Sequence, residues 1–123
     1  MAVLYSEKLL DHFRHPHNYG ALTDRDISYE SFNPLCGDRI RIDVKLEAGS
    51  VKEVRFRGDG CAISIAAASL LTELLTGRKL DEPPADAELI AALESDIQPA
   101  RVQCALLSLG ALREGIKIYL NGS

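Results

Sequence analysis

The chain lacks long apolar runs, and it has too little positive charge to suit nucleic-acid binding. Its 14 Lys and Arg residues are outnumbered by 18 Asp and Glu residues, which gives a formal net charge of −4. A protein that neutralises phosphates needs the opposite balance, so no nucleic-acid partner is expected. The most apolar run, residues 62–75, is shorter than a membrane helix and contains Glu73. The N-terminus carries charges too early for a signal peptide, and we expect a cytoplasmic protein that does not contact a membrane.

Cysteine is also scarce, because the chain has only Cys36, Cys61 and Cys104. An odd number of cysteines cannot form a closed set of disulfides, and a reducing compartment would not favour one. The three are too far apart in the sequence to form the closely spaced pairs of a zinc finger. Taken alone, they are compatible with three buried core thiols, since free cysteine is among the most often buried residues.

The patterns that are present predict one domain, residues 1–123, of the α+β class. Alternating apolar and charged residues predict strands over residues 26–32, 39–47 and 51–58. Apolar residues at helical spacing predict helices over residues 4–14, 62–76 and 100–119, with a short helix in the acidic segment 81–96. Strands followed by helices favour an antiparallel three-stranded sheet with helices packed on one face.

Apolar residues at spacings of three and four define the expected buried stripe of the last helix. These are Val102, Leu106, Leu109, Leu112, Ile116 and Leu120. Near the N-terminus, a cluster of histidines comprises His12, His15 and His17. We do not expect it to bind metal, because two of the three lie outside the predicted helix, histidine ligands usually need supporting partners, and no acidic or thiol side chain is expected to act as one here.

Each cysteine lies at the boundary of a predicted element. Cys36 is in the loop that enters strand 39–47, Cys61 opens the helix over 62–76, and Cys104 is in the first turn of the last helix, off its apolar stripe. A helix N-terminus presents free N–H groups and partial positive charge. We therefore expect lowered pKa values and thiolate character at Cys61 and Cys104.

Asp38 adds a carboxylate two residues after Cys36, and Gly37 and Gly60 allow the backbone to turn beside a ligand. Three thiolates and one carboxylate form a tetrahedral set suited to Zn²⁺, while iron–sulfur clusters are also held by thiolates. Such a zinc site would carry net negative charge, which a guanidinium such as that of Arg101 would partly offset. These residues by themselves leave the choice between the two kinds of site open.

Four stretches carry a resemblance to a known family. "LLDHFRHPHNYG", "NPLCGDRIRI", "FRGDGCAISIAAASLLTELLTGR" and "PARVQCALLSLGAL" resemble the IscU/SufU/NifU N-terminal family of iron–sulfur cluster assembly proteins, and the match covers essentially the whole chain. The resemblance implies a SufE/NifU-like fold. Within the family the last three stretches are similar to the zinc-containing SufU branch.

Resemblance to SufU implies a zinc ion held by Cys36, Asp38, Cys61 and Cys104. It implies that Cys36 accepts persulfide sulfur from a SufS-type cysteine desulfurase, one of whose histidines replaces Cys36 on the zinc. Arg101 matches an arginine that supports this site, so Cys36 and Arg101 are the candidate catalytic residues. The implied later partners are downstream cluster-assembly or apo-acceptor proteins.

Two departures keep an alternative open. SufU proteins have an extra segment between the second and third cysteines, whereas only residues 62–103 separate Cys61 from Cys104 here, as in IscU scaffolds. IscU proteins, however, have a histidine where this chain has Gln103, and a chaperone-recognition LPPVK motif where it has "IQPAR". The alternatives are thus a zinc-dependent sulfurtransferase, a non-enzymatic scaffold that assembles and transfers a transient [2Fe–2S] cluster on the same ligands, and a purely structural zinc domain.

Overall fold

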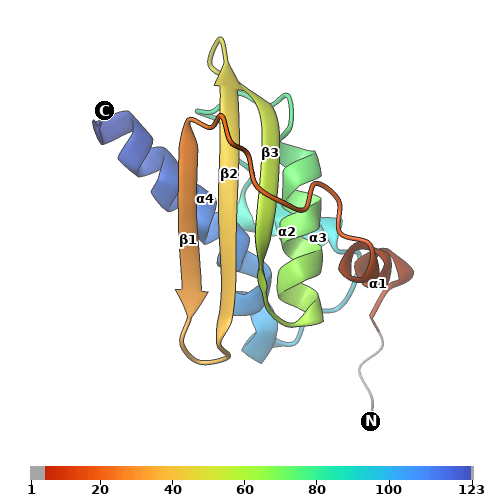
Figure 1. The fold of residues 1–123 in the computed structure, drawn as a ribbon. Helices are drawn as coiled ribbons and strands as arrows, with labels where there is room; N and C mark the ends of the chain where they lie inside the picture. The colour runs from red at the N-terminus through yellow and green to blue at the C-terminus, as the bar shows by residue number, and fades with distance from the viewer. Residues whose placement is uncertain (1–4, 123) are drawn as a thin grey trace.

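The computed structural model describes residues 5–122, which form a three-stranded sheet with helices on one face (Figure 1). The elements are α1 (Glu7–Arg14), β1 (Ile27–Asn33), β2 (Asp38–Glu47), β3 (Ser50–Asp59), α2 (Ala62–Leu75), α3 (Asp86–Ala92), the 3₁₀ turn η1 (Pro99–Arg101) and α4 (Val102–Gly122). This arrangement confirms the predicted α+β fold with an antiparallel three-stranded sheet. Within residues 5–122, no helix has the length and apolar character that a membrane crossing requires.

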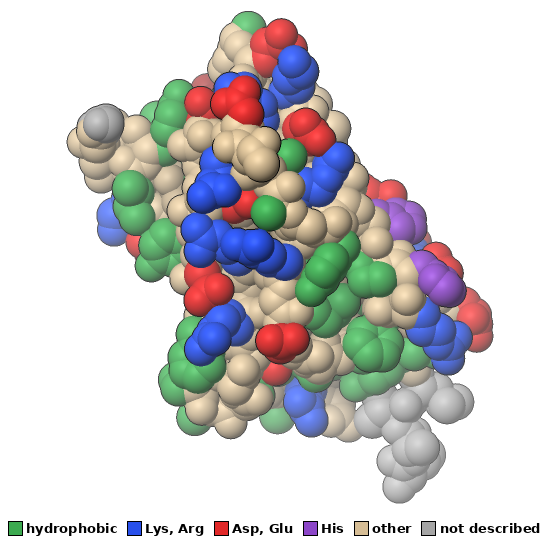
Figure 2. All heavy atoms as spheres, viewed as in Figure 1, with side chains coloured by type: hydrophobic (Ala, Val, Ile, Leu, Met, Phe, Trp, Pro, Cys, Tyr) green, Lys and Arg blue, Asp and Glu red, His purple; other side chains and the backbone are tan. Residues whose placement is uncertain are grey.

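The sheet has one buried face and one open face. Ile40, Ile42 and Val44 of β2 are fully buried, and Phe56 of β3 pairs with Ile42 on the same face. The residues that alternate with them along each strand point to the other face, as the pleat of a strand requires. Figure 2 shows Lys and Arg side chains gathered over this open face with acidic side chains among them. Cross-strand ion pairs such as Arg39–Glu30, at 3.5 Å, partly balance the charge there.

Small residues let α2 and α4 lie close to the sheet and to each other. Ala66, Ala67 and Ala68 of α2 are fully buried, and the helix contacts α1, β3 and α4. α4 crosses β1 and β2. A Cβ atom on Gly115 of α4 would lie 2.7 Å from Cγ2 of Ile27 in β1, so only glycine fits at this crossing.

The predicted buried stripe of α4 is correct only in its middle. Leu109, Leu112 and Ile116 are buried, but Leu120 is 68% exposed. The buried face is instead completed by small side chains and one thiol: Cys104, Ala105, Ser108, Ala111 and Gly115. Cys104 therefore lies on the buried face, contrary to the prediction that it is off the stripe. Close contact with the sheet favours small residues, which a hydrophobicity pattern does not mark.

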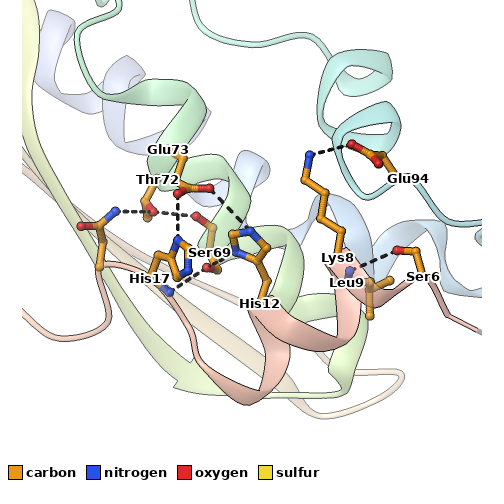
Figure 3. Close-up of polar contacts among 10 residues, drawn as sticks. Ser6, Lys8, Leu9, His12, His17, Ser69, Thr72, Glu73 and Glu94 are labelled. Carbon is orange, nitrogen blue, oxygen red and sulfur yellow. Dashed lines mark hydrogen bonds and ion pairs between the residues drawn. The ribbon is translucent and has the colours of Figure 1, made fainter.

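α1 is held at its start by Ser6, whose side chain accepts a hydrogen bond from the backbone N–H of Leu9 (Figure 3). The same hydroxyl donates to the carbonyl of Leu93 at 2.8 Å, which ties α1 to the segment after α3. Leu9 and His12 form the buried side of α1, whereas Phe13 is partly exposed. The predicted start at Leu4 lies outside the described residues.

Two glycines of α4 give a matched test of the close packing. Gly115→Ala places a methyl group against Ile27, an overpacking cost of about 1–3 kcal/mol that exceeds the gain in helix propensity of at most about 1 kcal/mol. Gly110→Ala meets no atom within 4 Å and should stabilise the protein by about 0.5–1 kcal/mol. Urea denaturation should therefore show shifts of opposite sign. Equal stabilisation by both variants would contradict the close approach at Gly115.

Candidate metal centre

Cys36 is presented by the turn that joins β1 to β2. The side-chain Oδ1 of Asn33 accepts a hydrogen bond from the N–H of Leu35 at 3.0 Å, and the Asn33 carbonyl accepts one from the N–H of Gly37 at 2.8 Å. Gly37 has a φ of +77°, a left-handed conformation that glycine adopts without strain. The turn leaves Cys36 exposed.

Asp38, the first residue of β2, is a buried carboxylate beside this turn. Burial would raise the pKa of Asp38, but hydrogen bonds from the side chains of Ser64, Cys36 and Cys61 outweigh it and hold the pKa below its usual value. A Cβ atom on Gly60 would lie 3.1 Å from Cγ of Asp38, so glycine makes room for the carboxylate. The result is an ionised oxygen donor inside the protein.

Two helix N-termini bring the other thiols to the same place. Cys61 is the N-cap residue of α2 and Cys104 lies in the first turn of α4. The β1–β2 turn and the starts of α2 and α4 are at one end of the sheet (Figure 1). Ligand atoms of Cys36, Asp38 and Cys104 all lie within 4.8 Å of one another. Cys61 lies outside this group but adjoins it, because its Sγ is 3.4 Å from the hydroxyl of Ser64, which donates a hydrogen bond to Asp38.

The donor set fits a metal ion bound by thiolates. The Sγ atoms of Cys36 and Cys104 are 3.8 Å apart. Two sulfurs bonded to one zinc ion at about 2.3 Å in tetrahedral geometry are separated by about 3.8 Å. Iron in a cluster also takes thiolate ligands, so this separation suits either occupant.

The pKa of Cys104 is opposite to the expectation from its helix position. Burial first, and then the neighbouring Cys61 and Cys36, raise the pKa of the Cys104 thiol to about 12. Low dielectric surroundings and two nearby sulfurs disfavour a further negative charge more than the helix terminus favours one. Cation binding reverses this balance, because a coordinated thiol gives up its proton.

Arg101 lies in η1, immediately before α4, and is exposed. A hydrogen bond with Cys104, and then the charges of Cys61 and Cys104, raise the pKa of its guanidinium. The predicted proximity of a positive charge to the thiols is thus present. The sequence did not reveal the role of Ser64, which donates a hydrogen bond to Asp38. The one local sign of this role is its position in the first turn of α2, three residues after the N-cap residue Cys61.

An exposed apolar surface adjoins Cys36. Leu35 is 92% exposed and Phe32 is half exposed. Both line a shallow hollow of about 410 Å³ between the β1–β2 turn and α4. The remaining lining residues are Ser31, Asn33, Pro34, Gln103, Leu106, Leu107 and Gly110. An apolar patch beside a reactive side chain is typical of a surface that a protein partner covers.

The histidines have an acidic partner that the local sequence did not reveal. Glu73 of α2 lies with His12 and His17 in a group whose ligand atoms are within 4.8 Å of one another. The expectation that no acid is near these histidines was therefore wrong, because α2 supplies it from more than fifty residues along the chain. Burial, followed by the adjacent His17, lowers the pKa of His12.

Comparison with known proteins identifies close relatives. The family model for the NifU-like N terminal domain matches residues 4–123. The chain is 33% identical to the zinc-dependent sulfurtransferase SufU of Bacillus subtilis, covering 92% of the chain and 89% of the relative. It is 34% identical to the iron–sulfur cluster assembly scaffold protein IscU of Escherichia coli K12, and the alignment covers 94% of this chain and 93% of that relative. The crystal structure of FiSufU from Fervidobacterium islandicum AW-1 superposes with a TM-score of 0.78 at 22% identity, over 91% of this chain and 96% of that one.

The two sequence alignments differ in length. The alignment with SufU spans 132 positions, more than the 123 residues of this chain, so SufU has residues that this chain lacks. The alignment with IscU spans 119 positions. This difference agrees with the shorter segment between Cys61 and Cys104 noted in the sequence.

Thiol alkylation should follow the order of exposure. In metal-free protein, we expect iodoacetamide to modify the exposed Cys36 first and the buried Cys104 at least roughly tenfold more slowly, because burial restricts access and keeps the thiol protonated. Peptide mass mapping over time measures each rate. Guanidinium-unfolded protein is the control, in which the three rates should converge. Equal rates at Cys36 and Cys104 in the folded protein would contradict the arrangement.

Proposed function

Because the chain belongs to the NifU-like N-terminal domain family of iron–sulfur cluster assembly proteins, we propose that it accepts sulfur from a cysteine desulfurase and carries it to cluster assembly. The observation that carries the proposal is the unequal exposure of the clustered thiols. Cys36 is exposed on a turn, while Cys104 is buried beneath it with its sulfur 3.8 Å away. An exposed thiol beside buried donor atoms is suited to a reaction with a cysteine of a partner protein.

The reaction is a sulfur transfer between two cysteines. The Cys36 thiolate attacks the outer sulfur of a persulfide on the desulfurase. A new S–S bond forms at Cys36, the S–S bond on the desulfurase breaks, and the desulfurase cysteine leaves as a thiolate. This is the chemistry of thiol–disulfide exchange, with no net oxidation or reduction, so its rate depends on thiolate fraction and access.

Zinc held by Cys36, Asp38, Cys61 and Cys104 would keep the thiols deprotonated and protected from oxidation. Asp38 is the one hard donor among three soft thiolates, so it is the donor least matched to zinc in such a set. Ser64 orients its carboxylate by a hydrogen bond. The guanidinium of Arg101, beside Cys104, offsets the negative charge of the thiolates. Arg101 thus acts on Cys36 by stabilising the ionised site.

A second candidate function is an assembly scaffold for a [2Fe–2S] cluster on the same ligands. It is favoured by the shorter segment between Cys61 and Cys104 and by the shorter alignment with IscU, 119 positions against 132 with SufU. Gln103 argues against the IscU form of this function, because a glutamine amide is a poor substitute for an imidazole ligand. Cytoplasmic sulfur transfer to downstream cluster-assembly or apo-acceptor proteins therefore remains the leading proposal.

The decisive experiment adds the zinc-loaded protein to a SufS-type desulfurase and measures sulfide or alanine production. We expect strong stimulation by the wild type and a return to the basal rate with Cys36→Ala, because the acceptor sulfur is lost. Zinc content and circular dichroism serve as controls for folding of the variant.

Two results would argue against sulfur acceptance. One is a Cys36→Ala variant that stimulates as well as the wild type. The other is weak stimulation together with a cluster that forms anaerobically from iron and sulfide and passes to an apo-ferredoxin. The second result would establish the scaffold function instead.

The apolar surface beside Cys36 provides a separate test of docking. Leu35→Ser should raise the protein concentration needed for half-maximal stimulation by about tenfold, because burial of one leucine at an interface contributes roughly 1.5 kcal/mol or more. Ile118→Ser is a matched control, since Ile118 is 57% exposed near the opposite end of α4. Equal effects of the two substitutions would show that the desulfurase does not cover the Leu35 surface.

A further inference from the structure

Three side chains of types that bind metal ions come from separate parts of the chain and meet at α2 (Figure 3). They form a different group from Cys36, Asp38 and Cys104. His12 comes from α1, His17 from the segment that follows it, and Glu73 from the last turn of α2. The two carboxylate oxygens of Glu73 face the two histidines. One lies 3.6 Å from Nε2 of His12 and the other 2.8 Å from Nδ1 of His17.

His12 is held in a fixed orientation. Its ring is buried, and Nδ1 lies 2.7 Å from the hydroxyl oxygen of Ser69, within hydrogen-bonding distance. The same oxygen accepts the backbone N–H of His17 at 2.8 Å. With the Nδ1 proton donated to Ser69, the lone pair of Nε2 points toward Glu73. Histidine ligands of metal ions are typically positioned in this way, by a hydrogen bond from the second ring nitrogen.

The other two donors are able to adjust. The side chains of His17 and Glu73 are 42% and 45% exposed, so each has space to move and solvent has access to the group. Asn18, next to His17, donates to the hydroxyl of Thr72 at 2.9 Å and ties this segment to α2. Ligands at about 2.0–2.1 Å from a tetrahedral ion are about 3.3 Å apart, so the present separations of up to 4.8 Å require only small rotations.

We propose that His12, His17 and Glu73 form a second binding site for a divalent transition-metal ion. Two imidazoles and one carboxylate suit Zn²⁺ or Fe²⁺ and leave coordination positions for water or another ligand. Glu73 lies twelve residues after Cys61, about 18 Å along the axis of α2, so the site is separate from the thiols. It does not depend on the function proposed for Cys36.

An ordinary ion pair explains the geometry less well. One histidine suffices to pair with a surface glutamate, whereas here two imidazole rings converge on one carboxylate with centroids 4.4 Å apart. Protonation of both rings would place two positive charges at that distance, which is unfavourable. A single metal ion removes this repulsion, because it replaces both protons and uses both rings as neutral donors.

The experiment uses the full chain with its thiol site already filled by one equivalent of zinc. Equilibrium dialysis against Zn²⁺, and titration with Co²⁺ followed by visible absorption, measure further binding. We expect one additional equivalent of either ion to bind, and the Co²⁺ bound to the zinc-loaded protein should show ligand-field bands without sulfur-to-metal charge transfer. His17→Ala and Glu73→Gln should weaken this binding by about tenfold or more while the first zinc equivalent is retained.

His15→Ala is the matched control, because His15 is an exposed histidine two residues from His17. It should leave both equivalents unchanged. The proposal is overturned if zinc-loaded wild type binds no second metal ion, if His15→Ala weakens binding as much as His17→Ala, or if the Co²⁺ bound to zinc-loaded protein shows thiolate charge transfer. Circular dichroism of each variant separates loss of the site from loss of folding.

Discussion

The close approach of α2 and α4 to the sheet is the constraint on which the candidate metal centre depends. Gly115 allows α4 to contact β1, and the alanines of α2 allow that helix to be buried along its length. The starts of both helices are thereby brought to the end of the sheet where β1 turns into β2. If either helix lay farther from the sheet, the sulfurs of Cys36 and Cys104 would not be 3.8 Å apart.

The metal centre concentrates groups whose burial is unfavourable without partners. An ionised Asp38 is maintained by hydrogen bonds, Cys104 is held in its protonated form, and Arg101 supplies positive charge from the surface. Burying such groups costs free energy unless they are paired or bind a metal ion. A bound cation would offset these costs, and Cys36 is the most exposed of the three thiols.

Two different sets of donor atoms lie along α2. Soft thiol groups gather at its N-terminus, while imidazole nitrogens and a carboxylate gather near its C-terminus. The first set suits zinc or an iron–sulfur cluster, and the second suits a divalent ion with open coordination positions. A single rigid, buried helix thus holds the two groups at a constant separation, and neither group needs the other to form.

The sequence by itself determined the elements and the position of each cysteine at an element boundary. Strand alternation in residues 39–47 and the boundary positions of the cysteines are local features, and the strand order and helix starts agree with them. The family motifs pointed to iron–sulfur cluster assembly, and the relatives support that conclusion. Only the tertiary structure decided the buried face of α4, the raised pKa of Cys104 and the meeting of Glu73 with His12 and His17. The reason is physical: burial, dielectric surroundings and contacts between distant segments depend on how the elements pack, and no local pattern of residues records them.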